Sequence, residues 1–191
     1  MRTREEWLHD LAARVAPILG CTVPAIRCSV GFPGGRSRSG RGKRIGECWD
    51  AAASSDGSNA IFVSPTIADA ATAAATLVHE LIHAAVGVKH GHRGPFRRMA
   101  LRVGLAGKMT ATTATPELAD KLAEIVDEIG PYPHAALNAD LSGRKKQSTR
   151  MLKLICRACG YTARTTAKWI ATGTPVCPCG TKMQNEDSDA D

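Results

Sequence analysis

The sequence predicts an α+β protein, in which one compact domain is built on a central apolar helix and is followed by a small cysteine-containing module. Residues 70–88 form an Ala-rich apolar run with helical spacing, and segments before it alternate polar and apolar residues with the period of a strand. After residue 130 the composition becomes polar and basic, and four of the seven cysteines follow in two close pairs. A chain of 191 residues with 43% hydrophobic residues can supply one core of ordinary size together with such a module.

The part before the central helix is expected to form one helix and a small sheet. Residues 4–19 carry apolar side chains at helical spacing and end at Gly20, which predicts an amphipathic helix. Residues 25–32 alternate with period two, and residues 44–51 and 59–64 form two further short strands joined by a turn-rich connection. Such a connection favours a hairpin, so we expect a small antiparallel sheet. Between the first two strands lies a basic loop that contains Arg36, Arg38, Arg41, Lys43 and Arg44.

The central helix is followed by more helices. Thr66 is expected to be its N-cap, because Asp69 follows three residues later in a variant of the capping box. Gly87 is a plausible end, and residues 90–94 form a Gly-rich turn. Two further helices are predicted over residues 96–105 and 116–129, the second with an apolar stripe that indicates a structural role.

The central helix contains the pattern His-Glu-x-x-His at residues 79–83. Residues four apart lie on the same helix face, so His79 and His83 can provide two ligands of a zinc ion. Glu80 lies beside them and can take a proton from a water molecule at the metal. The alternative is two unrelated histidines at this spacing. A catalytic zinc needs a third ligand, and His90 and His92 lie close enough in sequence to provide it.

The four paired cysteines predict a second zinc site, this one structural. They form a Cys-x-x-Cys pair and a Cys-x-Cys pair with seventeen residues between them, at Cys156, Cys159, Cys177 and Cys179. A module of about thirty residues cannot build a sufficient core of its own, so four thiolates on zinc would provide the missing stability. A redox-active pair is the competing interpretation. The second pair also departs from the Cys-x-x-Cys spacing that is more common in zinc ribbons.

The charge of the chain indicates an anionic partner. The net charge is +7, and without the acidic residues of the last six positions it is +11, from 25 basic and 14 acidic residues. Residues 142–169 contain eight basic residues and no acidic one, and such a stripe favours a phosphate backbone. Trp169 could stack on an unpaired base or could instead form the small core of the ribbon. The candidate nucleic-acid-binding residues are Arg144, Lys145, Lys146, Arg150, Lys153, Arg157, Arg164, Lys168 and Trp169.

The histidine pattern, together with the run Gly91-His92-Arg93-Gly94-Pro95-Phe96, resembles the signature of the SprT-like zinc metalloproteases, the family that includes Spartan. In that family the third ligand is the His of a Gly-His-Gly turn with a Phe four residues later. Phe96 lies four residues after His92, so the resemblance implies that His92 is the third ligand. The chain has Arg93 where the family usually has Gly. The resemblance implies a compact zincin-like protease domain over residues 1–130. Composition and cysteine spacing predict a basic linker over 131–150, a zinc ribbon over 151–183 and an acidic tail over 184–191.

The resemblance also implies a function. We expect a zinc endopeptidase that acts on DNA-bound or DNA-crosslinked proteins, with two zinc ions per chain and with single-stranded or distorted DNA as a partner. Two alternatives are a zinc peptidase whose viral or host target is not linked to DNA, and a non-enzymatic nucleic-acid-binding zinc protein. The sequence has no apolar run of eighteen residues and no signal-peptide pattern, so we expect a cytoplasmic monomer, near the nucleoid or in a host cell, that does not bind membranes.

Overall fold

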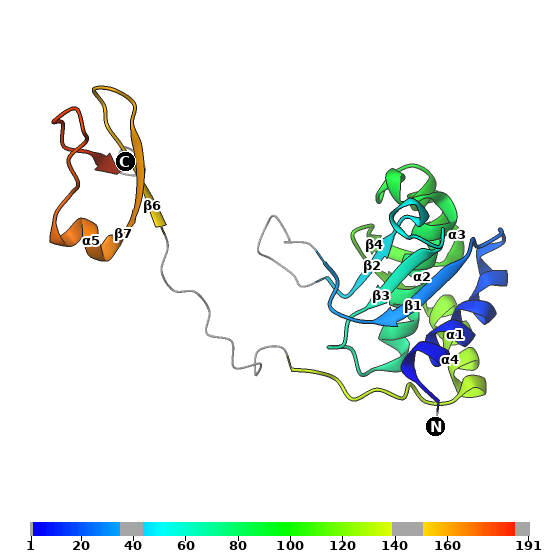
Figure 1. Cartoon of the computed structure of the whole chain (residues 1–191). Helices are drawn as coiled ribbons and strands as arrows, with labels where there is room; N and C mark the ends of the chain where they lie inside the picture. The colour runs from blue at the N-terminus through cyan, green and yellow to red at the C-terminus, as the bar shows by residue number, and fades with distance from the viewer. Residues whose placement is uncertain (1, 35–43, 139–150, 186–191) are drawn as a thin grey trace. The chain divides into compact units, whose positions relative to one another are not determined.

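The computed structural model describes residues 2–34, 44–138 and 151–185. The chain divides into two compact units, Met1–Asp140 and Leu141–Asp191, each with its own small sheet or sheets (Figure 1). The structure is α+β, as predicted, with helices and short strands in both units. No helix in the described part of the chain is long and apolar enough to cross a membrane.

Helices α1 and α2 form the centre of the first unit. Helix α1 spans Arg4–Leu19 as predicted, begins with a capping box between Thr3 and Glu6, and ends at Gly20 in the left-handed conformation. Helix α2 spans Ala70–Val86. The prediction that Thr66 caps α2 is wrong, because the carboxylate of Asp69 accepts the hydrogen bond from the Thr72 amide at 2.7 Å. Thr66 lies in the preceding turn instead, with its hydroxyl 2.9 Å from that of Ser64.

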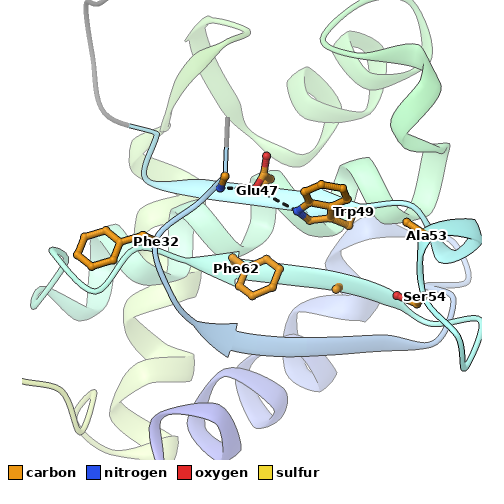
Figure 2. A pocket seen from close by; sticks show the side chains of 8 residues that line it. Phe32, Glu47, Trp49, Ala53, Ser54 and Phe62 are labelled. Carbon is orange, nitrogen blue, oxygen red and sulfur yellow. Dashed lines mark hydrogen bonds between the residues drawn. The ribbon is translucent and has the colours of Figure 1, made fainter. Parts of the chain in front are cut away.

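The first sheet contains β1 (Ile26–Val30), β2 (Gly46–Trp49) and β3 (Asn59–Val63) in the order β1-β3-β2. Strand β2 is antiparallel to β3, which confirms the predicted hairpin. Strand β1 is parallel to β3, so the prediction that the whole sheet is antiparallel is wrong. A period-two pattern predicts which side chains face the core, but it carries no information about strand direction. Inner-face residues such as Ile61 are buried in the helix-covered core, whereas Glu47, Trp49 and Phe62 lie on the outer face (Figure 2).

After α2 the chain forms the short helix η2 (Val88–His90), helix α3 (Pro95–Val103) and a hairpin of β4 (Leu105–Lys108) and β5 (Ala111–Ala114). The sequence pattern does not predict this hairpin and extends the helix to residue 105 instead. Gly104 ends α3 with a φ of 102°, a conformation that favours glycine. Leu105 is therefore the first residue of a strand.

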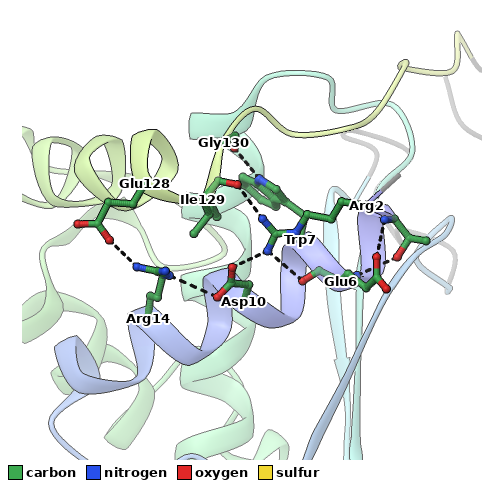
Figure 3. Close-up of polar contacts among 9 residues, drawn as sticks. Arg2, Glu6, Trp7, Asp10, Arg14, Glu128, Ile129 and Gly130 are labelled. Carbon is green, nitrogen blue, oxygen red and sulfur yellow. Dashed lines mark hydrogen bonds and ion pairs between the residues drawn. The ribbon is translucent and has the colours of Figure 1, made fainter.

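Helix α4 spans Pro116–Ile129, as predicted, and packs against α1. Polar contacts join the ends of these two helices (Figure 3). Arg2 donates to the carbonyl of Ile129 at 2.7 Å, and the Trp7 indole donates to the carbonyl of Gly130 at 2.8 Å. The structural role predicted for α4 agrees with this packing, since α4 also contacts α2.

Residues 131–138, which the sequence assigns to the linker, pack on the first unit. The ring of Tyr132 lies 4.7 Å from that of Trp7, and Nε2 of His134 lies 2.9 Å from the carbonyl oxygen of Pro65. Tyr132 is buried, and burial raises the pKa of its phenol to about 12. These contacts extend the first unit beyond the end of α4.

The second unit has a sheet in the order β7-β6-β8, formed by β6 (Met151–Ile155), β7 (Thr162–Thr166) and β8 (Gln184–Asn185), and one short helix, α5 (Ala167–Thr172). Strand β8 lies just beyond residue 183, the predicted end of the ribbon. Trp169 is 57% exposed, so the interpretation of this residue as the ribbon core is wrong. The core of this unit instead consists of Leu154, Cys156, Cys177 and Met183.

Candidate metal centres

Three histidine side chains meet at the surface of α2. His79 and His83 project from successive turns of the helix, and His92 comes from the turn after η2. Nε2 of His92 lies 3.1 Å from Nε2 of His79 and 3.2 Å from Nε2 of His83. A ring nitrogen carries either one proton or one lone pair, so it cannot make two full hydrogen bonds at once. Three converging imidazole nitrogens are better explained as a set of metal ligands.

The turn that carries His92 is shaped by two glycines. Gly91 has a φ of 51° and Gly94 a φ of 47°, whereas no described residue other than glycine has a positive φ. Arg93 therefore needs no glycine-like conformation, although the SprT-like family usually has glycine at this place. Of the two histidines that the sequence left as candidates, His92 and not His90 joins the histidine group.

The three imidazoles pack around Phe96, which is fully buried. Its ring stacks on His83 with a centroid distance of 4.2 Å, and it lies 4.8 Å from His79 and 5.1 Å from His92. Burial lowers the pKa of His79 to about 4 and that of His83 to about 3, and burial also lowers the pKa of His92. All three rings are therefore neutral at pH 7, which is the form that can bind a metal.

His79 has a second partner that the sequence did not reveal. Its Nδ1 lies 2.9 Å from Oγ1 of Thr112, which projects from strand β5. A metal ligand that uses Nε2 has its proton on Nδ1, and an acceptor there fixes the ring orientation. Thr112 fits this role. The sequence signal was weak because Thr112 belongs to the hairpin that was not predicted. Nδ1 of His83, by contrast, is buried without a hydrogen-bond partner in the described structure.

Glu80 follows His79 on α2 and is only 6% exposed. Burial, with a smaller contribution from Glu47, raises the pKa of Glu80 to about 8. The backbone of Gly46 in β2 lies directly against this side chain. A Cβ atom at Gly46 would lie 2.5 Å from Oε1 of Glu80 and 2.6 Å from Cγ2 of Thr76, so only glycine fits here. Gly46 is a second residue of the site that the sequence did not single out.

The histidine geometry fits a zinc ion. With a Zn–N bond of about 2.0–2.1 Å, tetrahedral ligands are separated by about 3.3 Å. The two Nε2 separations, 3.1 and 3.2 Å, are close to this value. His79, His83 and His92 offer ligand atoms that all lie within 4.8 Å of one another. Two metal sites are thus geometrically possible in the chain, because the cysteines form another.

The four cysteines of the second unit converge in the same way. Sγ of Cys156 lies 3.5 Å from that of Cys179, and Sγ of Cys159 lies 3.4 Å from that of Cys177, with all four thiols free. With Zn–S bonds of about 2.3 Å, tetrahedral thiolates are separated by about 3.8 Å. The hydroxyl of Thr181 lies 3.5 Å from Sγ of Cys179. Hydrogen bonds with this hydroxyl, with the Thr181 backbone and with neighbouring cysteines lower the pKa of the Cys179 thiol to about 6.

The unusual Cys-x-Cys spacing does not prevent the second pair from forming a turn like the first. Gly160 donates to the carbonyl of Cys156 at 2.9 Å, and Gly180 donates to the carbonyl of Cys177 at 2.8 Å. Both glycines directly follow the second cysteine of their pair and have a positive φ, 75° and 88°. Each pair therefore ends in a tight glycine turn that presents its sulfur atoms to the same point.

The predicted nucleic-acid-binding residues are only partly described. Arg144, Lys145, Lys146 and Arg150 lie outside the described residues. Lys153 and Arg164 lie opposite each other on β6 and β7, and the Lys168 amine lies 5.1 Å from the centroid of the Trp169 ring. Arg157 donates to the side chain of Gln184 at 3.3 Å. The described part of the stripe thus combines basic side chains with an exposed indole.

No protein-family model, no curated protein and no solved structure matches this chain.

Proposed function

We propose that this chain is a zinc-dependent endopeptidase of the SprT-like type that acts on DNA-bound proteins. The observation that carries the proposal is the convergence of three neutral imidazoles, together with a buried carboxylate that directly follows the first of them in α2. His79, Glu80 and His83 all lie on α2, so two of the three candidate ligands and the carboxylate are held by one helix. Purely structural zinc sites use their ligands alone and need no such carboxylate.

His79, His83 and His92 would hold the zinc ion, with Thr112 fixing the ring of His79 through Nδ1. When bound, zinc supplies a Lewis acid that polarises a peptide carbonyl and makes water more acidic. Glu80 then accepts a proton from the attacking water and returns it to the leaving amine. The raised pKa of Glu80 suits this role, because an acid–base group works best when its pKa is near the working pH. A zinc ion held by the three histidines would favour the carboxylate form of Glu80 and would bring the pKa of Glu80 closer to neutrality.

The second unit supports the proposed role of DNA. Lys153 and Arg164 place two basic residues opposite each other on neighbouring strands, and basic side chains contact the phosphate backbone of nucleic acids. Trp169 is 57% exposed and Tyr161 is 52% exposed, which leaves both rings available for stacking on unpaired bases. This unit would hold the protein on DNA while the first unit cleaves.

A cleavage assay with and without single-stranded DNA tests the proposal. The substrate is a DNA-binding protein, and the matched control enzyme carries Glu80→Gln. Cleavage that requires DNA supports the proposal, whereas cleavage that is indifferent to DNA indicates a peptidase with another target. Tight DNA binding without any cleavage by the zinc-loaded protein would leave only a non-enzymatic zinc protein. The Glu80→Gln protein should lose hydrolysis and keep its zinc, and retained activity would remove Glu80 from its proposed role.

A further inference from the structure

The few aromatic residues of the first unit fall into two groups. The chain has only three Trp, three Phe and two Tyr. Trp7, Phe96 and Tyr132 are buried in the core. Phe32, Trp49 and Phe62 instead lie together on the outer face of the β1-β3-β2 sheet, where Phe32 is 61% and Trp49 is 48% exposed (Figure 2). Water-exposed aromatic rings in one cluster on a sheet face usually mark an interaction site.

These rings surround a hollow of about 380 Å³. Its floor is made of small side chains, since Ala60 lies directly opposite Trp49 in the sheet and Ala53 and Ser54 close one end. The volume lies at the lower end of the range of about 300–1,000 Å³ that is typical of small-molecule sites. A flat ring the size of a nucleobase therefore suits the hollow better than the broad surface of a folded protein.

The tryptophan of the hollow is held in place. Oε2 of Glu47 accepts hydrogen bonds from the Trp49 indole at 3.1 Å and from the Gly34 amide at 2.6 Å. Oε1 of Glu47 accepts from Arg44 at 2.8 Å, so the negative charge of Glu47 is already paired. A fixed ring loses little conformational entropy when a ligand stacks on it.

Glycine keeps the ring surfaces accessible. A Cβ at Gly31 would lie 3.3 Å from Cδ1 of Phe62, and a Cβ at Gly34 would lie 3.3 Å from the carboxylate of Glu47 and 3.7 Å from the Trp49 ring. Side chains at these two positions would therefore crowd the hollow.

The acidic groups around the hollow already have partners. Asp56 is paired with Arg27 at 3.2 Å, and Asp50 accepts a hydrogen bond from the Ala52 amide at 3.0 Å. The chain as a whole has a net charge of +7, which favours a polyanionic partner. Exposed aromatic rings on a basic protein are features by which proteins bind single-stranded nucleic acid.

We infer that the hollow lined by Phe32, Trp49 and Phe62 binds an unpaired base of single-stranded DNA, with the base stacked on Trp49. This surface belongs to the first unit and is additional to the stripe of the second unit. The inference rests on the proposed function only in the choice of DNA as the nucleic acid. An aromatic peptide side chain is the competing ligand.

Fluorescence anisotropy of the zinc-loaded full chain with labelled oligonucleotides tests the inference. All proteins carry Trp169→Ala, so that stacking on the second unit does not hide the effect. Trp49→Leu should weaken binding of oligothymidine about 5- to 150-fold, because stacking on one ring contributes about 1–3 kcal/mol per base. Trp49→Phe keeps an aromatic ring and should retain most of the affinity. Leu101→Ala is the control, because Leu101 lies on α3 and is about as exposed as Trp49, and it should leave the affinity unchanged.

An abasic oligomer with the same phosphate backbone separates stacking from charge. It should bind Trp49→Leu and the parent equally, because it has no base to stack. The inference is overturned if Trp49→Leu and Leu101→Ala bind oligothymidine equally well, or if the loss is the same for the abasic oligomer. It is also overturned if oligouridine RNA or an aromatic peptide depends on Trp49 while DNA does not. Cleavage plays no part in these measurements, so an inactive peptidase would leave the inference standing.

Discussion

The contact between Gly46 and Glu80 provides the sharpest test of the candidate site. In Gly46→Ala the new methyl group would lie 2.5 Å from Oε1 of Glu80 and 3.0 Å from its Cγ. Ordinary carbon contacts are about 3.5–4.0 Å, so the carboxylate or the strand must move by about 1 Å. A displacement of about 1 Å in a catalytic group can reduce the rate about 100-fold. We therefore expect kcat to fall about 100-fold, with both zinc ions still bound.

The assay compares peptidase rates, zinc content and thermal unfolding for Gly46→Ala and two reference proteins. Gly173→Ala is the matched control, because Gly173 has extended backbone and a methyl group there would meet no atom within 4 Å. Glu80→Gln is the second reference protein and sets the background rate, because it removes the carboxylate that Gly46→Ala displaces. Overpacking should also cost about 1–3 kcal/mol of stability. Full activity with unchanged unfolding would refute the steric argument.

Three further outcomes follow from the two metal sites. Thr112→Val should weaken zinc binding at the histidine site about 10- to 100-fold, measured by chelator competition, whereas Thr113→Val on the exposed face of β5 should not. Cys177→Ser should reduce the zinc content from two ions to one and unfold the second unit by circular dichroism, while cleavage of a short peptide persists. In chelated protein the folded-state pKa of His79, about 4, lies below its unfolded value of about 6.5, so the unfolded state binds the proton first. The contribution of His79 to stability should therefore fall as the pH drops from about 6.5 to 4, by about 2 kcal/mol at pH 5. Urea titrations of the parent and of His79→Gln separate it from the contributions of His83 and Glu80, and a difference between the two proteins that does not change with pH would contradict the burial of His79.

The sequence predicted those features that depend on residues close together in the chain. The bounds of α1 and α4 follow from helical periodicity, and the spacing of His79 and His83 follows from one helical turn. Features that depend on distant parts of the chain were not predicted. Thr112 is 33 residues from His79, and the hairpin that carries it has too few apolar residues to show a strand pattern.

The direction of β1 and the exposure of Trp169 were missed for related reasons. Alternation is the same in parallel and antiparallel strands, so it could not reveal that β1 runs parallel to β3. A tryptophan in a small module is equally compatible with a core and with a surface position. The core of the second unit is completed by Met183, which lies far along the chain from Leu154.

The two faces of strand β2 lie in different surroundings. Gly46 and Cys48 face the core, where Gly46 leaves room for Glu80 and where burial raises the pKa of Cys48 to about 12. Glu47 and Trp49 face outward and line the aromatic hollow. A shift of register by one residue would turn Glu47 toward Glu80 and Trp49 into the core, so it would bring two carboxylates together in a buried place. The register of β2 is therefore strongly specified. The same register places Gly46 against Glu80 and places Trp49 in the hollow.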